Sequence, residues 1–224
     1  MNGEKWIRKS KVLNRSFHTD VFISKTKPKG IVLWLGGSGM DKNKYNSRGK
    51  TVPTIFENTW NRLGHDLPII FIFVTAPYDI RFANFTDFPE DKNRWNEHIE
   101  SEILNTWQDL PVYLIGNSGG AALALNGIHR MSRVVGAGCM GADNIPENFE
   151  VPLDKSGEPV WRLRIYYNWD DLVYNKNESI IDNLIKKDFV EPPIGYEGEH
   201  CTKHYIENQS FDGLIKKALE AFNN

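Results

Sequence analysis

The chain has 224 residues, of which 40% are hydrophobic and 25% are charged, and this composition is ordinary for a globular protein. Its formal net charge of −2 gives no electrostatic reason to expect a nucleic-acid partner. The length fits one compact domain over residues 1–224, large enough to fold around a core of its own.

The first third of the chain predicts an edge hairpin followed by buried strands. Apolar residues alternate loosely over 6–25 with Asn14-Arg15 between the two halves, which is typical of an antiparallel hairpin at a sheet edge. Residues 31–35 and 69–74 are continuous apolar runs, as expected for strands buried on both faces. Between these strands, the segment from Val52 to Leu63 predicts a helix that begins with a proline in its first turn.

The rest of the chain alternates between helical and strand patterns. The predicted elements are a helix with apolar residues four apart (Trp95, Ile99, Ile103 and Trp107), a strand, turn and helix within 112–131, strands at 134–140 and 163–167, a helix at 180–185, a loop with at most a short strand at 190–205, and an amphipathic helix at 211–222. Strands that alternate with helices in this way indicate the α/β class. We therefore expect a mostly parallel central sheet with helices on both faces.

One motif stands at the centre of the chain. The sequence Gly116-Asn117-Ser118-Gly119-Gly120 fits Gly-x-Ser-x-Gly and lies between an apolar run and a run of small residues. In a strand–turn–helix setting this motif forms a nucleophile elbow, a turn so sharp that side chains two residues either side of the serine would clash. The serine hydroxyl then lies at a helix N-terminus, where the positive potential favours an oxyanion. The alternative is a glycine-rich turn with an inert serine, but the flanking patterns favour Ser118 as a nucleophile.

A serine becomes a good nucleophile when a base takes its proton and an acid orients that base. After the strand predicted at 163–167 the chain reads Asn168-Trp169-Asp170-Asp171-Leu172-Val173. Here it resembles the α/β-hydrolase superfamily, whose acid often stands in Asp-x-x-Val after the penultimate strand and whose triad follows the order Ser, Asp or Glu, His. The resemblance implies an α/β-hydrolase fold and selects Asp170 as the triad acid. Asp171 and Asp143 remain alternatives.

The same resemblance implies a base in a late loop. Gly198-Glu199-His200 fits the Gly-x-His that family members often carry there, so His200 is the expected base and His204 is the alternative. The remaining histidines stand where a histidine usually packs or faces solvent: His18, His65, His98 and His129. No histidine and carboxylate spacing suggests a metal site.

An oxyanion hole needs two backbone N–H donors. The resemblance implies that one belongs to Gly119, the residue after the serine, and that the other comes from the turn Gly36-Gly37-Ser38-Gly39. Within that turn Ser38 is the first choice and Gly37 the second. Many relatives begin this turn with histidine, and Gly36 in its place leaves the backbone donor intact.

A narrower resemblance comes from Ala76-Pro77 followed by a loop that ends in Trp95. This stretch is similar to that of the compact phospholipase/carboxylesterase group, which includes acyl-protein thioesterases. The chain departs from that group at Gly119, where a glutamine usually follows the serine. The spacing of the motifs leaves no room for a large lid domain.

The resemblance implies a serine hydrolase that cleaves a small-molecule carboxylic ester or thioester through an acyl-enzyme on Ser118, without a metal or cofactor. Two other functions remain open. One is a small-molecule binding protein on the same scaffold with little turnover. The other is a peptidase or acyltransferase that uses the same triad.

Two features bear on the compartment. The apolar run at 67–74 is far shorter than the roughly 20 residues of a membrane-spanning helix, so no membrane span is expected. The two cysteines, Cys139 and Cys201, form no disulfide framework in the pattern of the sequence, and the first residues show no secretory signal. We therefore expect a cytoplasmic protein.

Overall fold

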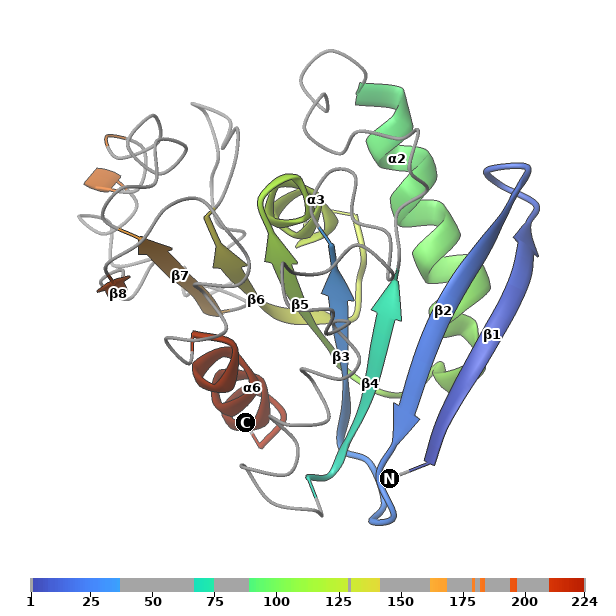
Figure 1. The fold of residues 1–224 in the computed structure, drawn as a ribbon, viewed down its shortest axis with the longest axis horizontal. Coiled ribbons are helices and arrows are strands. Elements are labelled where there is room, and N and C mark those ends of the chain that lie inside the picture. The colour runs from blue at the N-terminus through green and yellow to red at the C-terminus, as the bar shows by residue number, and fades with distance from the viewer. Residues whose placement is uncertain are drawn as a thin grey trace, which may run out of the picture.

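A computed structural model describes residues 2–36, 67–74, 89–128, 130–141, 162–168, 179, 182–183, 194–196 and 210–223. The described strands form one eight-stranded sheet in the order β1-β2-β4-β3-β5-β6-β7-β8 (Figure 1). The strands are β1 (Asn2–Ser10), β2 (Arg15–Ile23), β3 (Gly30–Leu35), β4 (Ile69–Val74), β5 (Val112–Asn117), β6 (Val134–Met140), β7 (Arg162–Asn168) and β8 (Ile194–Tyr196). The helices are α2 (Pro89–His98), the π-helix η2 (Ile99–Ile103), the 3-10 helix η3 (Leu104–Trp107), α3 (Gly119–Ile128) and α6 (Ser210–Ala221).

The N-terminal hairpin predicted from the sequence is confirmed. Strands β1 and β2 pair antiparallel from Asn2↔Ile23 to Ser10↔Arg15, and β1 lies at the edge of the sheet. The turn between them ends at Asn14, whose φ of +52° lies in the left-handed region that asparagine tolerates better than most residues. Strand β2 then pairs antiparallel with β4, so the hairpin extends the sheet on one side.

The remaining strands run parallel, as the alternating pattern predicts. Parallel pairing links β4 to β3, β3 to β5, β5 to β6, β6 to β7 and β7 to β8. The short strand allowed within 190–205 is β8, three residues long. The helix predicted from Val52 to Leu63 lies outside the described residues, as does most of the one predicted at 180–185.

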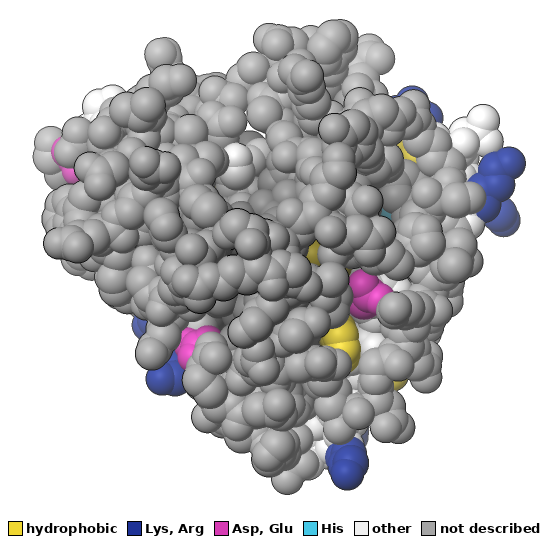
Figure 2. All heavy atoms as spheres, viewed as in Figure 1, with side chains coloured by type: hydrophobic (Ala, Val, Ile, Leu, Met, Phe, Trp, Pro, Cys, Tyr) yellow, Lys and Arg dark blue, Asp and Glu magenta, His cyan; other side chains and the backbone are white. Residues whose placement is uncertain are grey.

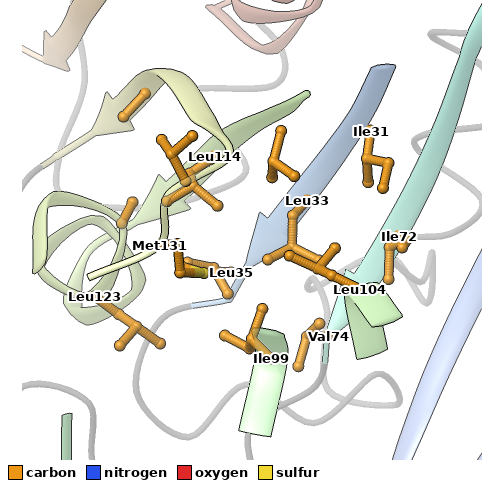
Figure 3. Packing of buried hydrophobic residues seen from close by; sticks show 14 of the residues in the cluster. Ile31, Leu33, Leu35, Ile72, Val74, Ile99, Leu104, Leu114, Leu123 and Met131 are labelled. Atoms are coloured by element: carbon orange, nitrogen blue, oxygen red, sulfur yellow. The ribbon is translucent and has the colours of Figure 1, made fainter. Parts of the chain in front are cut away.

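Alternate residues of the central strands build two separate cores. On one face, every second residue of β3, β4 and β5 packs against α2, η2, η3 and α3 (Figure 3), including Ile31, Leu33, Leu35, Ile72, Val74 and Leu114. On the other face, a second buried cluster joins residues of β3, β4 and β5 to Leu214, Ile215 and Ala218 of α6; its strand members include Val32, Trp34, Phe71, Phe73, Tyr113 and Ile115. The continuous apolar runs are therefore explained by helices that cover both faces of the sheet.

The amphipathic C-terminal helix is confirmed as α6. Its residues Leu214, Ile215 and Ala218 are fully buried against the sheet. A Cβ atom at Gly138 of β6 would lie 2.3 Å from Leu214 Cδ2, so the missing side chain at this glycine lets α6 pack closely on the strand.

The helix predicted around Trp95 and Trp107 takes a different form from a continuous α-helix. It is α-helical to His98, widens to a π-helix over Ile99–Ile103 and tightens to a 3-10 helix over Leu104–Trp107. In an α-helix of 3.6 residues per turn, side chains four residues apart do not stay on one face. Over the three steps from Trp95 to Trp107 their direction rotates by about 120°, away from the sheet. A wider turn corrects this drift, and Trp95, Ile99 and Ile103 stay buried in the same core.

Helix α2 and the π-helix η2 both bind the turn of the N-terminal hairpin. Glu102 Oε1 accepts the N–H of Lys11 at 2.7 Å, and Arg94 Nη2 donates to the Val12 carbonyl at 2.7 Å. The other Glu102 oxygen lies 2.6 Å from His98 Nδ1. Burial raises the pKa of Glu102, but hydrogen bonds from Ser10, His98 and Lys11 outweigh it and lower the pKa to about 2. Burial lowers the pKa of His98 below 6.5, and its bond and attraction to Glu102 oppose that shift in part.

We expect the free energy of unfolding to fall as the pH drops from 7.5 to 5. The unfolded chain protonates His98 below its ordinary pKa of 6.5, whereas the folded protein resists that proton because the pKa is lowered. The slope from this one group stays below about 1.4 kcal/mol per pH unit. Urea unfolding of wild type and of His98→Gln at several pH values measures it, and the variant should show the smaller slope.

The range from pH 7.5 to 5 separates the contribution of His98 to the free energy of unfolding from that of Glu102. The stability that Glu102 contributes is complete above the ordinary carboxyl pKa of 4.5 and is lost as the pH falls toward 2, so it does not change between 7.5 and 5. Equal slopes for wild type and His98→Gln would contradict the prediction.

Candidate active site

The sequence around Ser118 folds as a strand, a turn of one residue and a helix. Strand β5 is buried along its whole length and ends at Asn117, and α3 begins at Gly119. Ser118 alone connects the two elements. The strand and the helix predicted on either side of the motif are thus confirmed, although α3 ends at Ile128, before the predicted limit of residue 131.

Ser118 has a left-handed backbone conformation. Its φ is +53°, which costs a residue other than glycine roughly 1–2 kcal/mol. The Ser118 N–H donates to the Met140 carbonyl at 3.0 Å, and the Ser118 carbonyl accepts the N–H of Ala121 at 2.9 Å. Such strain persists where surrounding contacts fix the backbone, and it collects at functional sites.

Two glycines give this turn its space. A Cβ at Gly116 would lie 2.4 Å from both the Ala121 Cα and the Gly120 carbonyl oxygen. A Cβ at Gly120 would lie 2.1 Å from the Leu35 carbonyl oxygen and 2.4 Å from that of Gly36. Real side chains do not approach backbone atoms so closely. The clash across the turn expected from the Gly-x-Ser-x-Gly pattern is therefore present at Gly116, whereas Gly120 is required by the backbone at the end of β3.

The predicted oxyanion donors come from two segments that the fold brings together. Gly119 is the first residue of α3, so its N–H has no acceptor within the helix and lies at the positive end of the helix dipole. Gly120 is packed against Leu35 and Gly36, where β3 ends and the turn predicted to supply the second donor begins. Ser38 and Gly37 themselves lie outside the described residues.

The predicted acid and base also lie outside the described residues, but the strands before them do not. Strand β7 ends at Asn168, shortly before Asp170 and Asp171, and β6 ends at Met140, shortly before Asp143. Strand β8 ends at Tyr196 and precedes His200 and His204. Because β5, β6, β7 and β8 are parallel neighbours, their carboxyl ends share the edge at which Ser118 lies.

Two other reactive side chains among the described residues serve packing. Cys139 on β6 is a free thiol, fully buried, and burial raises its pKa to about 12, which suppresses the nucleophilic thiolate. His98 is buried and packs edge-on against Trp95 with ring centroids 5.6 Å apart. Of the two environments expected for His98, packing or solvent, the structure shows packing.

Two neighbours of Ser118 were not predicted as part of the site. The Asn117 side-chain amide donates to the Met140 carbonyl at 3.2 Å, and Gly141, directly after β6, has a φ of +54°. The residue before the serine is variable in the Gly-x-Ser-x-Gly pattern, so nothing in the sequence marks Asn117.

Among the described residues, no helix is long and apolar enough to cross a membrane. No three His, Cys, Asp or Glu side chains of that part of the chain gather into a group that could hold a metal ion. On the face shown in Figure 2, the described Lys and Arg side chains lie at separate points near the rim rather than in one patch.

No family model and no curated protein matches the chain. Solved structures do resemble it. A ferulic acid esterase is 14% identical with a TM-score of 0.67 over 97% of this chain and 98% of that chain. The S-formylglutathione hydrolase FrmB of Staphylococcus aureus is 15% identical, with a TM-score of 0.67 over 100% of this chain and 96% of that chain. FphF, a fluorophosphonate-binding serine hydrolase of the same organism, is 12% identical, with a TM-score of 0.66 over 100% of this chain and 99% of that chain. Together with the strand order, these likenesses show that the chain has the α/β-hydrolase fold.

Proposed function

We propose that this chain is a serine hydrolase that cleaves a small-molecule carboxylic ester or thioester through an acyl-enzyme on Ser118. The observation that carries the proposal is the left-handed φ of +53° at Ser118, between β5 and α3. A strained serine in this position presents its hydroxyl above the sheet edge, ready to react. The esterases and the serine hydrolase among the similar structures support acyl transfer as the chemistry.

The proposed reaction begins with attack by the Ser118 hydroxyl on the substrate carbonyl. His200 takes the hydroxyl proton as the bond from oxygen to carbon forms, and Asp170 orients His200 and stabilises its positive charge. His200 then returns the proton to the leaving alcohol or thiol as its bond to the carbonyl carbon breaks. Water, activated by the same histidine, releases the acid and restores Ser118.

The oxyanion of each tetrahedral intermediate is stabilised by backbone donors. Gly119 supplies one N–H from the first turn of α3, and Ser38, or Gly37 in its place, supplies the other. The close contact of Gly120 with Leu35 and Gly36 supports this pairing, because it joins the start of α3 to the end of β3. The proposal needs no metal or cofactor.

The proposal extends to the organisation of the chain. Residues 1–224 form one domain without a large lid, so the substrate reaches Ser118 past loops at the carboxyl edge of the sheet. The cysteine usage supports a cytoplasmic location, which stays a prediction.

The test is covalent labelling with a fluorophosphonate, which phosphonylates activated serines, followed by mass spectrometry of the labelled peptide. We expect the label on Ser118 and none on Ser132, an exposed serine after α3 that serves as an internal control. Labelling should fall at least 100-fold in His200→Ala and Asp170→Asn, because both remove the activation of the hydroxyl. His204→Ala, Asp171→Asn and Asp143→Asn are expected to label within about threefold of wild type, as residues outside the triad should.

The labelling result discriminates between the possible functions. A folded wild type that is not labelled at Ser118 would overturn the proposal in favour of a binding protein on the same scaffold. A labelled protein that cleaves amides, or transfers the acyl group to an acceptor other than water, in preference to hydrolysing esters and thioesters would also overturn the stated reaction. Strong loss in Asp171→Asn or Asp143→Asn instead of Asp170→Asn would move the acid to that residue.

A further inference from the structure

We infer that Asn117 is a positioning residue for Ser118: its side-chain amide and the Ser118 N–H hold one shared acceptor, the Met140 carbonyl oxygen, and so fix the nucleophile in its left-handed conformation. This inference rests on the proposed role of Ser118 as the nucleophile. Asn117 has no part in bond making or breaking, and it acts through the backbone of the next residue.

Two donors from consecutive residues converge on Met140. Asn117 is the last residue of β5 and pairs with Met140, the last residue of β6. Asn117 Nδ2 donates to the Met140 carbonyl oxygen at 3.2 Å, and the Ser118 N–H donates to the same oxygen at 3.0 Å. The exposed fraction of Asn117 is 2% and that of Met140 is 0%, so water does not compete for these bonds. The two bonds can use both lone pairs of the carbonyl.

The shared carbonyl needs such a restraint because of the residue that follows it. Gly141 has a φ of +54°, and glycine allows the Met140–Gly141 peptide plane more orientations than any other residue would. The Asn117 amide selects one orientation. In that orientation the carbonyl faces Ser118 and accepts its N–H.

Loss of the Asn117 amide therefore acts on the serine through its backbone. With one donor fewer, the Met140 carbonyl can tilt, and the contact that opposes the strain at Ser118 weakens. A shift of the hydroxyl by a fraction of an ångström lowers the chance that it meets the substrate carbonyl in line, and misplacement of about 1 Å costs roughly 100-fold in rate. Substrate binding depends on other groups, so KM should change little.

Asn117→Leu and Asn96→Leu form a matched pair for the experiment. Asn96 on α2 is also buried, with an exposed fraction of 3%, and its Nδ2 donates to Asn126 Oδ1 at 2.7 Å, near the far end of α3 from Ser118. Each change removes one buried side-chain amide and keeps a similar volume. Titration with the fluorophosphonate counts reactive sites, so turnover is expressed per labelled Ser118 and is independent of any loss of folded protein.

We expect Asn117→Leu to lower kcat per labelled site by about 10- to 100-fold with KM within about twofold of wild type. Asn96→Leu should keep the wild-type kcat per labelled site even where its stability falls. An unchanged kcat per site in Asn117→Leu, or an equal loss in Asn96→Leu, would overturn the inference. An unlabelled wild type would overturn the proposed function first, and the inference with it.

Asn117→Asp supplies a second readout and covers the case in which the leucine variant does not fold. An aspartic acid at this buried position can donate to the Met140 carbonyl only while it is protonated, and as a carboxylate it repels that oxygen. The ratio of its kcat to that of wild type should therefore rise as the pH falls from 9 to 5, toward wild type at the low end. Asn117→Leu, which is neutral and has no donor, should show a flat and low ratio. A flat ratio in Asn117→Asp would overturn the inference.

Discussion

Replacing Ser118 by alanine is expected to lower kcat for a simple ester by about 10⁴- to 10⁶-fold. Without the hydroxyl no acyl-enzyme forms, and the residual rate comes from the oxyanion donors and substrate binding alone. Alanine keeps the same Cβ at a φ of +53°, so we expect the free energy of unfolding to stay within about 1 kcal/mol of wild type. Hydrolysis of 4-nitrophenyl acetate and urea unfolding measure the two quantities on the same preparation.

The matched control is Ser132→Ala, at an exposed serine outside the site, which should leave both quantities unchanged. A fall of less than about tenfold in Ser118→Ala would mean that ester cleavage does not pass through Ser118. The stability measurement matters because a large loss of folded protein would imitate a catalytic effect. Unfolding that matches wild type assigns the loss of rate to the chemistry of the hydroxyl.

Local patterns predicted most of the sheet because its strands are buried on both faces. The runs at 69–74 and 134–140 become β4 and β6 with the same limits, since a strand buried on both faces needs an apolar or small residue at every position. The helix predicted around Trp95 shows the limit of this approach. A four-residue spacing fits an α-helix over one or two turns, and the π-helix at Ile99–Ile103 is set by contact with the sheet over a longer stretch.

The candidate site also has parts that local sequence patterns predict and parts that they do not. The turn at Ser118 is predictable because its motif is local and a Cβ at Gly116 would meet atoms of the turn itself, although glycine at 120 is required by the distant backbone of Leu35 and Gly36. The bond from Asn117 to Met140 joins residues 23 apart in the chain, and an asparagine in the variable position of the motif gives no sign of it. The choice of Asp170 and His200 comes from resemblance, because no local pattern determines which loop carboxylate or imidazole reaches the serine.

Replacing Gly120 by alanine is expected to lower the free energy of unfolding by about 3 kcal/mol or more. The new methyl group would lie 2.1 Å from the Leu35 carbonyl oxygen and 2.4 Å from the Gly36 carbonyl oxygen. Both are backbone atoms held at the end of β3, so no side-chain rotation relieves the overlap. Either the start of α3 moves away from the sheet or β3 shifts within it, and each movement opens space in a packed core.

Gly127→Ala in the same helix provides the comparison. Its methyl group would lie 2.5 Å from Met131 Cε and 2.9 Å from Leu114 Cδ1, which are the ends of flexible side chains, and alanine gains about 1 kcal/mol in helix propensity over glycine. We therefore expect Gly127→Ala to stay within about 1.5 kcal/mol of wild type by urea unfolding. Equal losses in the two variants would show that the contact with β3 is not what requires glycine at 120.

The same pair of variants separates packing from catalysis. Movement of α3 away from β3 would carry the Gly119 N–H away from the turn that begins at Gly36, where the second oxyanion donor is proposed. Folded Gly120→Ala should therefore lose turnover per labelled site as well as stability, whereas Gly127→Ala should keep its turnover per site. A destabilised Gly120→Ala with wild-type turnover per site would place the oxyanion donors elsewhere. The close approach of Gly120 to the end of β3 thus accounts for the required glycine and supports the proposed alignment of the two donors.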